Sequence, residues 1–279
     1  MTLTSSAQAA MVPATHARSW LLVAGSGPDE FAAAANSAAD AVIFDLEDGV
    51  VPSSKTQARE DVARFLAGGG TGWVRINDVT TADWTADLDA IRGLPGLSGV
   101  MLAKAESADH IDRTAAELPH IPILALVESA RGVEFAFDIA SADATTRIAF
   151  GTGDFRRDTD AGAEPDALAY ARGRLVVASR AAGLPGPVDG PCLTGEPDLS
   201  EALAVTRSMG MTGKLCMHVG HTPIVNRELS PLQSDVAWAA EVIAHLGAQG
   251  ENIADGSDRP KLARALRITH LADVFSVSA

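Results

Sequence analysis

Short apolar runs alternate along the chain with longer stretches in which apolar positions recur at helical spacing. The short runs are apolar at nearly every position, which is typical of parallel strands buried on both faces. The pattern predicts eight strands, at Ser19–Ala24, Ala41–Leu46, Gly72–Ile76, Gly99–Ala103, Ile121–Val127, Arg147–Phe150, Pro187–Gly190 and Lys214–His218.

The longer stretches predict a helix after each strand, and serine, glycine and proline residues mark several of their ends. The predicted helices are Asp29–Ala39, Lys55–Leu66, Thr81–Ile91, Ser107–Leu118, Val133–Ala140, Pro165–Ala182, Leu199–Met209 and Ser234–Leu246. Repeated strand–helix alternation without a break in composition predicts an α/β fold, a closed (β/α)8 TIM barrel with right-handed crossovers.

The barrel is expected to span residues 18–246. Residues 1–17 are rich in alanine, serine and threonine and are predicted to form a disordered tail. Residues 247–279 follow the last strand–helix pair and are predicted to form a C-terminal lid or subunit contact, with a helix at Arg259–Phe275. The sequence thus predicts one barrel with two terminal additions.

Composition narrows the function classes. The 279 residues suit one barrel, since such barrels need roughly 250 residues. A net charge of −14 argues against a nucleic-acid surface. Cys192 and Cys216 form neither a disulfide framework nor a metal-ligand spacing. Residues 1–17 lack the basic and apolar regions of a signal peptide, and no run approaches the roughly 18 apolar residues of a membrane span. We expect a cytoplasmic protein.

Charged residues follow several predicted strands, where a parallel barrel carries its active site. Glu128 and Asp154 follow the fifth and sixth strands, so their carboxylates are expected to converge. Two carboxylates with water and substrate oxygens suit Mg²⁺, and no histidine–cysteine cluster offers a zinc site. The alternative is that each acid caps a helix or pairs with Arg131 or Arg156. The pairing of the two positions favours metal binding.

Arg75 lies inside an apolar strand, and an arginine there needs anionic partners because burial of an unpaired charge is costly. It could stabilise an enolate or a tetrahedral oxyanion. Asp45, Glu47 and Asp48 crowd the end of the second strand, where they could orient Arg75 or metal-bound water. A structural ion pair with one of them is the alternative, and it is compatible with catalysis.

Weaker candidates surround these residues. Lys104 and Glu106 end the fourth strand and are expected to form a salt bridge with each other. The turn at Gly25 precedes a helix and could present backbone N–H groups to a phosphate. His218 and His221 follow the eighth strand and are minor candidates for a base.

A set of five motifs in a fixed order resembles the citrate lyase beta-subunit-like family of CoA-ester lyases, which are malyl-CoA/citramalyl-CoA lyase-like aldolases. The motifs are Arg18–Gly25, Ala39–Val50, Val74–Asn77, Leu126–Gly132 and Gly213–His218. The likeness extends to about residue 260. It implies an Mg²⁺-dependent barrel that cleaves or forms carbon–carbon bonds in malyl-CoA, citramalyl-CoA or citryl thioesters.

The resemblance also implies roles by position. Glu128 and Asp154 would be the metal ligands, and Arg75 would hold the thioester carbonyl or its enolate. Asp45 and Glu47 would be the acids that support this site.

The remaining roles concern the cofactor and the lid. Gly25 and Lys104 are the candidate contacts for CoA. The lid of such proteins often contributes an acid to a neighbouring subunit, which makes Asp258 the candidate proton-transfer residue. The expected partners are a small acyl-CoA and a keto acid, with neither nucleic acid nor membrane. The expected assembly is a homo-oligomer, a trimer or a dimer of trimers.

The chain also departs from the family pattern. Ala24–Pro28 replaces the usual Pro-Gly turn, Gly153 stands where an acid usually precedes the metal aspartate, and Phe155–Asp158 is unusually basic. Val219–His221 replaces a turn that usually contains proline and glutamine. Two alternatives therefore stay open: a CoA-independent, metal-dependent pyruvate or 2-keto acid aldolase, and a beta subunit of a citrate lyase-type complex that is inactive alone.

Overall fold

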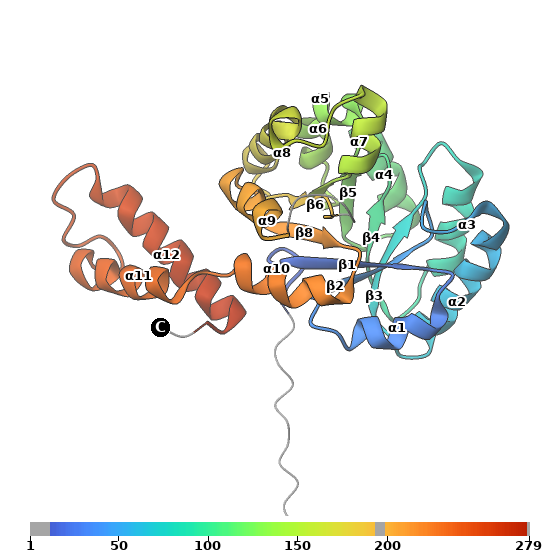
Figure 1. Cartoon of the computed structure of the whole chain (residues 1–279), viewed down its shortest axis with the longest axis horizontal. Helices are drawn as coiled ribbons and strands as arrows, with labels where there is room; N and C mark the ends of the chain where they lie inside the picture. Colours follow the sequence, from blue (N-terminus) through green and yellow to red (C-terminus); the bar gives the residue numbers. More distant parts are fainter. Residues whose placement is uncertain (1–11, 193–198, 278–279) are drawn as a thin grey trace, which may run out of the picture. The chain divides into compact units, whose positions relative to one another are not determined.

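Two compact units make up the protein (Figure 1), whose computed structural model describes residues 12–192 and 199–277. The larger unit is Ala17–Leu229. The smaller unit combines Ser230–Ala279 with Met1–His16. Among the described residues, no helix is both long and apolar enough to cross a bilayer.

Eight parallel strands close the larger unit into a barrel in sequence order, so the predicted TIM-barrel fold is confirmed. The strands are β1 (Ser19–Ala24), β2 (Ala41–Asp45), β3 (Gly72–Ile76), β4 (Leu97–Leu102), β5 (Ile123–Val127), β6 (Thr145–Phe150), β7 (Val188–Asp189) and β8 (Gly213–Cys216). The ring closes where Ser19–Leu21 of β1 pair with Lys214–Cys216 of β8.

Helices surround this ring and alternate with its strands (Figure 1). The α-helices of the larger unit are α1 (Pro28–Ala35), α2 (Lys55–Ala67), α3 (Ala82–Ile91), α4 (Ala108–Glu117), α5 (Ala130–Glu134), α6 (Ala136–Ser141), α7 (Thr152–Thr159), α8 (Ala169–Ala181), α9 (Leu199–Ser208) and α10 (Thr222–Glu228). Short 3-10 turns are η1 (Pro52–Ser54), η2 (Pro165–Leu168) and η3 (Val219–His221).

Strand residues alternate between two buried layers. Leu21 and Val23 of β1 belong to the cluster that packs under the helices. Because successive side chains on a strand point to opposite faces, Trp20 faces the barrel interior. Its ring meets that of Trp73 edge-on at 5.1 Å between centroids. These two layers explain why the strand sequences are apolar at nearly every position.

Arg147 on β6 is buried among the strands that complete the ring. Its guanidinium donates to the carbonyl oxygens of Ala17 and Gly186 at 2.7 and 2.8 Å, and to the hydroxyl of Thr212 at 2.7 Å. Burial lowers the pKa of Arg147 to about 9. This arginine therefore joins three chain segments in a region where β7 contributes only two residues.

Two helices differ from the prediction. α7 occupies a segment expected to be an irregular loop, because most of its residues are polar and only Thr152 and Phe155 are buried. α10 lies next to β1 and β8, in the place predicted for a helix at residues 234–246. The short, largely polar sequence of α10 gave little helical signal.

The smaller unit contains α11 (Gln233–Leu246) and α12 (Asp258–Phe275). Ala239 of α11 packs with Ala265 and Ile268 of α12 in a separate apolar cluster. The two compact units divide between residues 229 and 230, whereas the sequence predicts a barrel that ends at residue 246. The apolar positions of α11 indicate a buried face correctly, but the partner of that face is α12.

The predicted disordered tail falls mainly on residues 1–11, which lie outside the described residues. The prediction is too long at its other end. His16 packs edge-on against His270 within the smaller unit, at 5.2 Å between ring centroids. Ala17 is fully buried in the barrel.

Candidate metal centre

Three carboxylates from different parts of the barrel meet beyond the ends of its strands. Glu47 follows β2, Glu128 follows β5, and Asp154 lies in the first turn of α7 after β6. Their ligand oxygens all lie within 4.8 Å of one another. The structure thus brings together Glu128 and Asp154, as their positions after adjacent strands predict, and adds Glu47 to the group.

Glu128 is buried next to Glu47. Burial, with a further contribution from Glu47, raises the pKa of its carboxyl to about 8. A carboxylate that is costly to ionise alone is stabilised by a divalent cation, and a set of three carboxylates offers the oxygen donors that Mg²⁺ prefers. The residues present therefore fit this metal, and their assignment as ligands stays a prediction.

Gly151 allows the close approach of Glu128. A Cβ at this position would lie 2.5 Å from the Cβ of Glu128 and against its Oε2. The backbone N–H of Gly151 continues the strand pairing by donating to the carbonyl of Val127 at 3.0 Å. Any larger residue here would displace the carboxylate of Glu128. At Gly153, two residues later, an added Cβ would meet nothing within 4 Å.

The carboxylate of Asp154 lies near two cationic side chains. Oδ2 lies 3.1 Å from Nη2 of Arg157 and 3.9 Å from Nζ of Lys104. The alternative predicted for this acid, pairing with an arginine, is thus present, but through Arg157 rather than through Arg156. Because Arg157 is mostly exposed, this pair leaves Asp154 accessible to a metal.

Arg75 forms the expected ion pairs. Nε and Nη2 lie 2.6 Å from Oδ1 and Oδ2 of Asp45, and Nη1 lies 3.1 Å from Oε2 of Glu47. Burial acts to lower the pKa of Arg75, but the two carboxylates outweigh it and the pKa is raised. These contacts use three of the five N–H groups of a guanidinium.

Asp45 also organises the turn after β2. Oδ1 accepts the backbone N–H of Glu47, and Oδ2 accepts that of Gly49, both at 2.9 Å. Lys55 supports the same turn, because its Nζ donates to the carbonyl of Leu46 at 2.8 Å. Sequence reasoning did not identify Lys55, whose only signal is its place at the start of α2. Asp45 acts as a support for Arg75 and this turn.

Lys104 contacts all three clustered acids, Asp154 at 3.9 Å and the other two more closely. Its backbone N–H donates to Oε1 of Glu128 at 2.9 Å, and its Nζ lies 2.8 Å from Oε1 of Glu47. Burial acts to lower the pKa of Lys104, but Glu47, Asp48 and Glu128 together outweigh it and the pKa is raised. The predicted salt bridge with Glu106 is wrong, because Glu106 accepts a hydrogen bond from the hydroxyl of Ser129 at 2.6 Å. The assignment of Lys104 as a CoA contact stays a prediction.

The turn at Gly25 is engaged by the barrel itself. The N–H of Gly25 donates to the carbonyl of Asp45 at 2.8 Å, and the N–H of Gly27 donates to the carbonyl of Ala24 at 3.0 Å. A Cβ on Gly25 would lie 2.7 Å from the Asp45 carbonyl oxygen, which explains the glycine. Both N–H groups are thus engaged within the chain, and the phosphate contact at Gly25 stays a prediction.

The last candidates are two histidines and Asp258. His218 and His221 stack edge-on at 5.1 Å after β8, and burial lowers the pKa of His221. Asp258 belongs to the smaller unit, where its carboxylate accepts the backbone N–H of Ala254 at 3.1 Å and lies 3.2 Å from Nζ of Lys261. These contacts, the Ala254 hydrogen bond first, lower the pKa of Asp258.

Comparison with known proteins agrees with this division of the chain. The sequence model of the HpcH/HpaI aldolase/citrate lyase family matches residues 18–218. That of the HpcH/HpaI aldolase C-terminal domain matches residues 234–276, which correspond to α11 and α12.

Individual relatives cover most of the chain. A citrate lyase subunit beta-like protein of Mycobacterium tuberculosis is 35% identical over 235 residues, covering 81% of this chain and 83% of the relative. A (3S)-malyl-CoA thioesterase of Cereibacter sphaeroides is 31% identical over 252 residues, covering 86% and 88%. The crystal structure of CitE from M. tuberculosis in complex with magnesium, acetoacetate and coenzyme A superposes with a TM-score of 0.77, 29% identity, and coverage of 93% and 99%.

Proposed function

Because the chain belongs to the HpcH/HpaI aldolase/citrate lyase family, we propose that it is an Mg²⁺-dependent carbon–carbon lyase acting on a CoA thioester. The substrate class is a 3-hydroxyacyl-CoA such as malyl-CoA or citramalyl-CoA, which the enzyme cleaves or forms by Claisen-type condensation. The observation that carries the proposal is the convergence of Glu47, Glu128 and Asp154 beside the partly buried Arg75. The magnesium, acetoacetate and coenzyme A bound by the related CitE support it.

The three carboxylates would hold Mg²⁺, which supplies Lewis-acid polarisation and a template for the keto acid portion of the substrate. Arg75 retains two N–H groups beyond its contacts with Asp45 and Glu47. We assign them to the thioester oxygen, where negative charge develops as the carbon–carbon bond breaks. Asp45 fixes the guanidinium through two hydrogen bonds, so little reorganisation is needed during the reaction.

The experiment incubates the purified chain with malyl-CoA or citramalyl-CoA and Mg²⁺ and follows both keto acid and acyl-CoA. We expect cleavage that EDTA abolishes and that Glu128→Gln reduces by about a hundredfold or more while the chain stays folded. Glu106→Gln is the matched control, because Glu106 lies on the same rim but bonds Ser129 outside the metal cluster. Cleavage that persists in EDTA, or in Glu128→Gln, would contradict the proposal.

A CoA-independent aldolase is the second candidate, and one observation favours it: the N–H groups of Gly25 and Gly27 are not available to a phosphate. Release of pyruvate from a free 4-hydroxy-2-keto acid, with no cleavage of CoA thioesters, would establish that activity. Release of free CoA without a keto acid would indicate hydrolysis, the activity named for the C. sphaeroides relative. Inactivity of a folded chain on every substrate would favour the beta subunit of a citrate lyase-type complex.

We further propose a cytoplasmic homo-oligomer, a trimer or a dimer of trimers, in which Asp258 transfers a proton in a neighbouring subunit. The support for this role is the place of Asp258 at the start of α12, in the C-terminal unit that the resemblance identifies as the lid. Co-expression of Asp258→Asn with Arg75→Lys chains should restore part of the activity that each variant lacks alone. The absence of any restoration in a mixed oligomer would show that both residues act within one chain, and light scattering would give the subunit number.

A further inference from the structure

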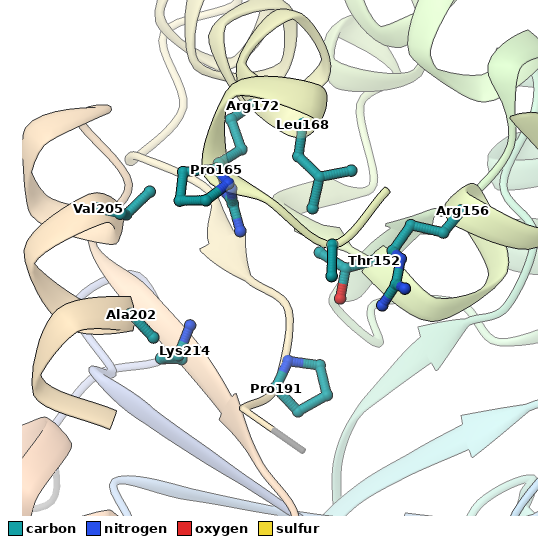
Figure 2. A pocket seen from close by; sticks show the side chains of 10 residues that line it. Thr152, Arg156, Pro165, Leu168, Arg172, Pro191, Ala202, Val205 and Lys214 are labelled. Carbon is teal, nitrogen blue, oxygen red and sulfur yellow. The ribbon is translucent and has the colours of Figure 1, made fainter. Parts of the chain in front are cut away.

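A cavity of about 50 Å³ lies outside the candidate metal centre, among α7, η2, α8, α9 and β8. Figure 2 shows it from close by. Its lining includes Thr152, Arg156, Arg172, Ala202 and Lys214, and among the described residues that line it none is acidic. By volume, the cavity could hold roughly four water molecules or one small polyatomic anion.

Two of the lining cations, Arg172 and Lys214, share a single carboxylate. Asp189, at the end of β7, is fully buried and lies 3.0 Å from Nε of Arg172 and 3.2 Å from Nζ of Lys214. Arg172 and Lys214 are themselves more than nine-tenths buried. One carboxylate thus faces two buried cations, and the group retains a net positive charge where solvent screens it poorly.

Several hydrogen-bond donors at the cavity are unused. Within the part of the chain that the structure describes, Nη1 and Nη2 of Arg172 have no acceptor, because its only bond runs from Nε to Asp189. The hydroxyl of Thr152 likewise has no partner among these residues. In Figure 2 the side-chain nitrogen atoms of Arg172 and Lys214 point toward one another, and Thr152 lies on the other side of the view, next to Arg156.

We propose that this cavity is a binding site for a small oxyanion, either a carboxylate or a phosphate-sized group, held by Arg172, Lys214 and the hydroxyl of Thr152. Two cations and a hydroxyl match the several acceptor oxygens of such an anion. The anion completes the neutralisation that Asp189 begins. The position, beside β7 and β8, is also where barrels of this architecture frequently bind phosphate groups. This site is independent of the proposed lyase activity.

The test measures thermal unfolding of the full chain, in EDTA, against increasing sodium phosphate or sodium acetate, with sodium chloride at equal ionic strength as reference. We expect at least one of the two anions to raise Tm by about 2 °C or more in a saturable way, because it binds only the folded state. Whichever gives the lower apparent Kd identifies the class of anion. A rise no larger than that with chloride for both would overturn the proposal.

Two variants locate the site. Ala202→Leu fills the cavity from α9 while keeping every charge, and should weaken anion binding at least tenfold. Ala204→Leu, on an exposed position of the same helix, is the matched control and should leave binding unchanged. Equal binding by both variants would place the anion elsewhere and overturn the proposal. Crystals grown with selenate supply a direct readout, since its anomalous signal should lie between Arg172 and Lys214.

Discussion

Lys104 donates its backbone N–H to Oε1 of Glu128 at 2.9 Å from a left-handed conformation, with φ at +50°. That conformation is costly for most residues, so its presence in a buried turn indicates that the surrounding contacts impose it. The side chain of Lys104 also donates a hydrogen bond from Nζ to Oε1 of Glu47. One lysine therefore holds two acids of the candidate metal centre by two separate means.

Replacement of Lys104 should separate the contribution of its backbone conformation from that of its side-chain ammonium. Lys104→Asn removes the ammonium but tolerates the left-handed backbone, so we expect metal affinity to fall about tenfold to a hundredfold with little change in Tm. Lys104→Val removes the ammonium and also resists the backbone conformation, so it should lower Tm as well. Calorimetric titration with Mn²⁺ or Mg²⁺ and thermal unfolding check both. Unchanged metal affinity in Lys104→Asn would show that the ammonium has no part in the site.

The raised pKa of Glu128 makes stability depend on pH in the metal-free protein. The carboxyl ionises near 8 when folded and near its ordinary 4.5 when unfolded, so the folded state holds more protons between these values. The free energy of unfolding should therefore fall as pH rises through this range, by at most about 1.4 kcal/mol per pH unit. Urea unfolding at several pH values in EDTA measures this slope, which Glu128→Gln should remove.

Binding of Mg²⁺ should release the proton that Glu128 holds. At pH 6–7 we expect about one proton per metal ion, falling toward none above pH 9, because the ligand must be ionised. Calorimetry in two buffers of different ionisation enthalpy counts these protons. Metal binding without proton release at pH 6 would show that Glu128 is either already ionised or not a ligand.

Two neighbouring glycines should respond in opposite ways to alanine. Gly151→Ala places a Cβ against Glu128 and should both destabilise the protein and weaken metal binding, by roughly tenfold or more. Gly153→Ala meets open space in the first turn of α7 and should stabilise the protein by about 0.5–1 kcal/mol. Tm and metal titration of the pair provide the measurement. Similar behaviour of both variants would contradict the close packing of Gly151 on Glu128.

Arg75→Lys tests whether geometry or charge matters at this position. A lysine keeps the charge but cannot form the two-point contact with Asp45, so we expect kcat to fall about a hundredfold or more. KM should change much less if the lost interaction belongs to the transition state. Steady-state kinetics on the active thioester separate the two parameters. A lysine variant with wild-type kcat would leave Arg75 as a structural ion pair alone.

The barrel was largely predictable from sequence because its strands are buried on both faces. Ser19–Ala24 and Gly72–Ile76 were predicted at the bounds that the structure shows. The convergence of Glu128 and Asp154 was equally accessible, since both follow adjacent strands. These features depend on local patterns and on a regular architecture.

Other features depend on contacts that no local pattern encodes. The partner of Lys104 is Glu47, which lies 57 positions away in sequence and becomes a neighbour only when the ring closes. The sequence shows that α11 has an apolar face, but it does not show which element packs against that face. α7 was not predicted because most of its residues are polar and only two of them are buried in the core.

The hydrogen bonds of Arg147 affect the stage of synthesis at which the barrel can close. One partner, Ala17, precedes it by 130 positions, and another, Thr212, follows it by 65. A nascent chain that has released β6 but not yet Thr212 cannot complete this set of bonds. At that stage the Ala17 carbonyl is available to Arg147 but the Thr212 hydroxyl is not, and the ring can close only after β8, which follows Thr212, has left the ribosome.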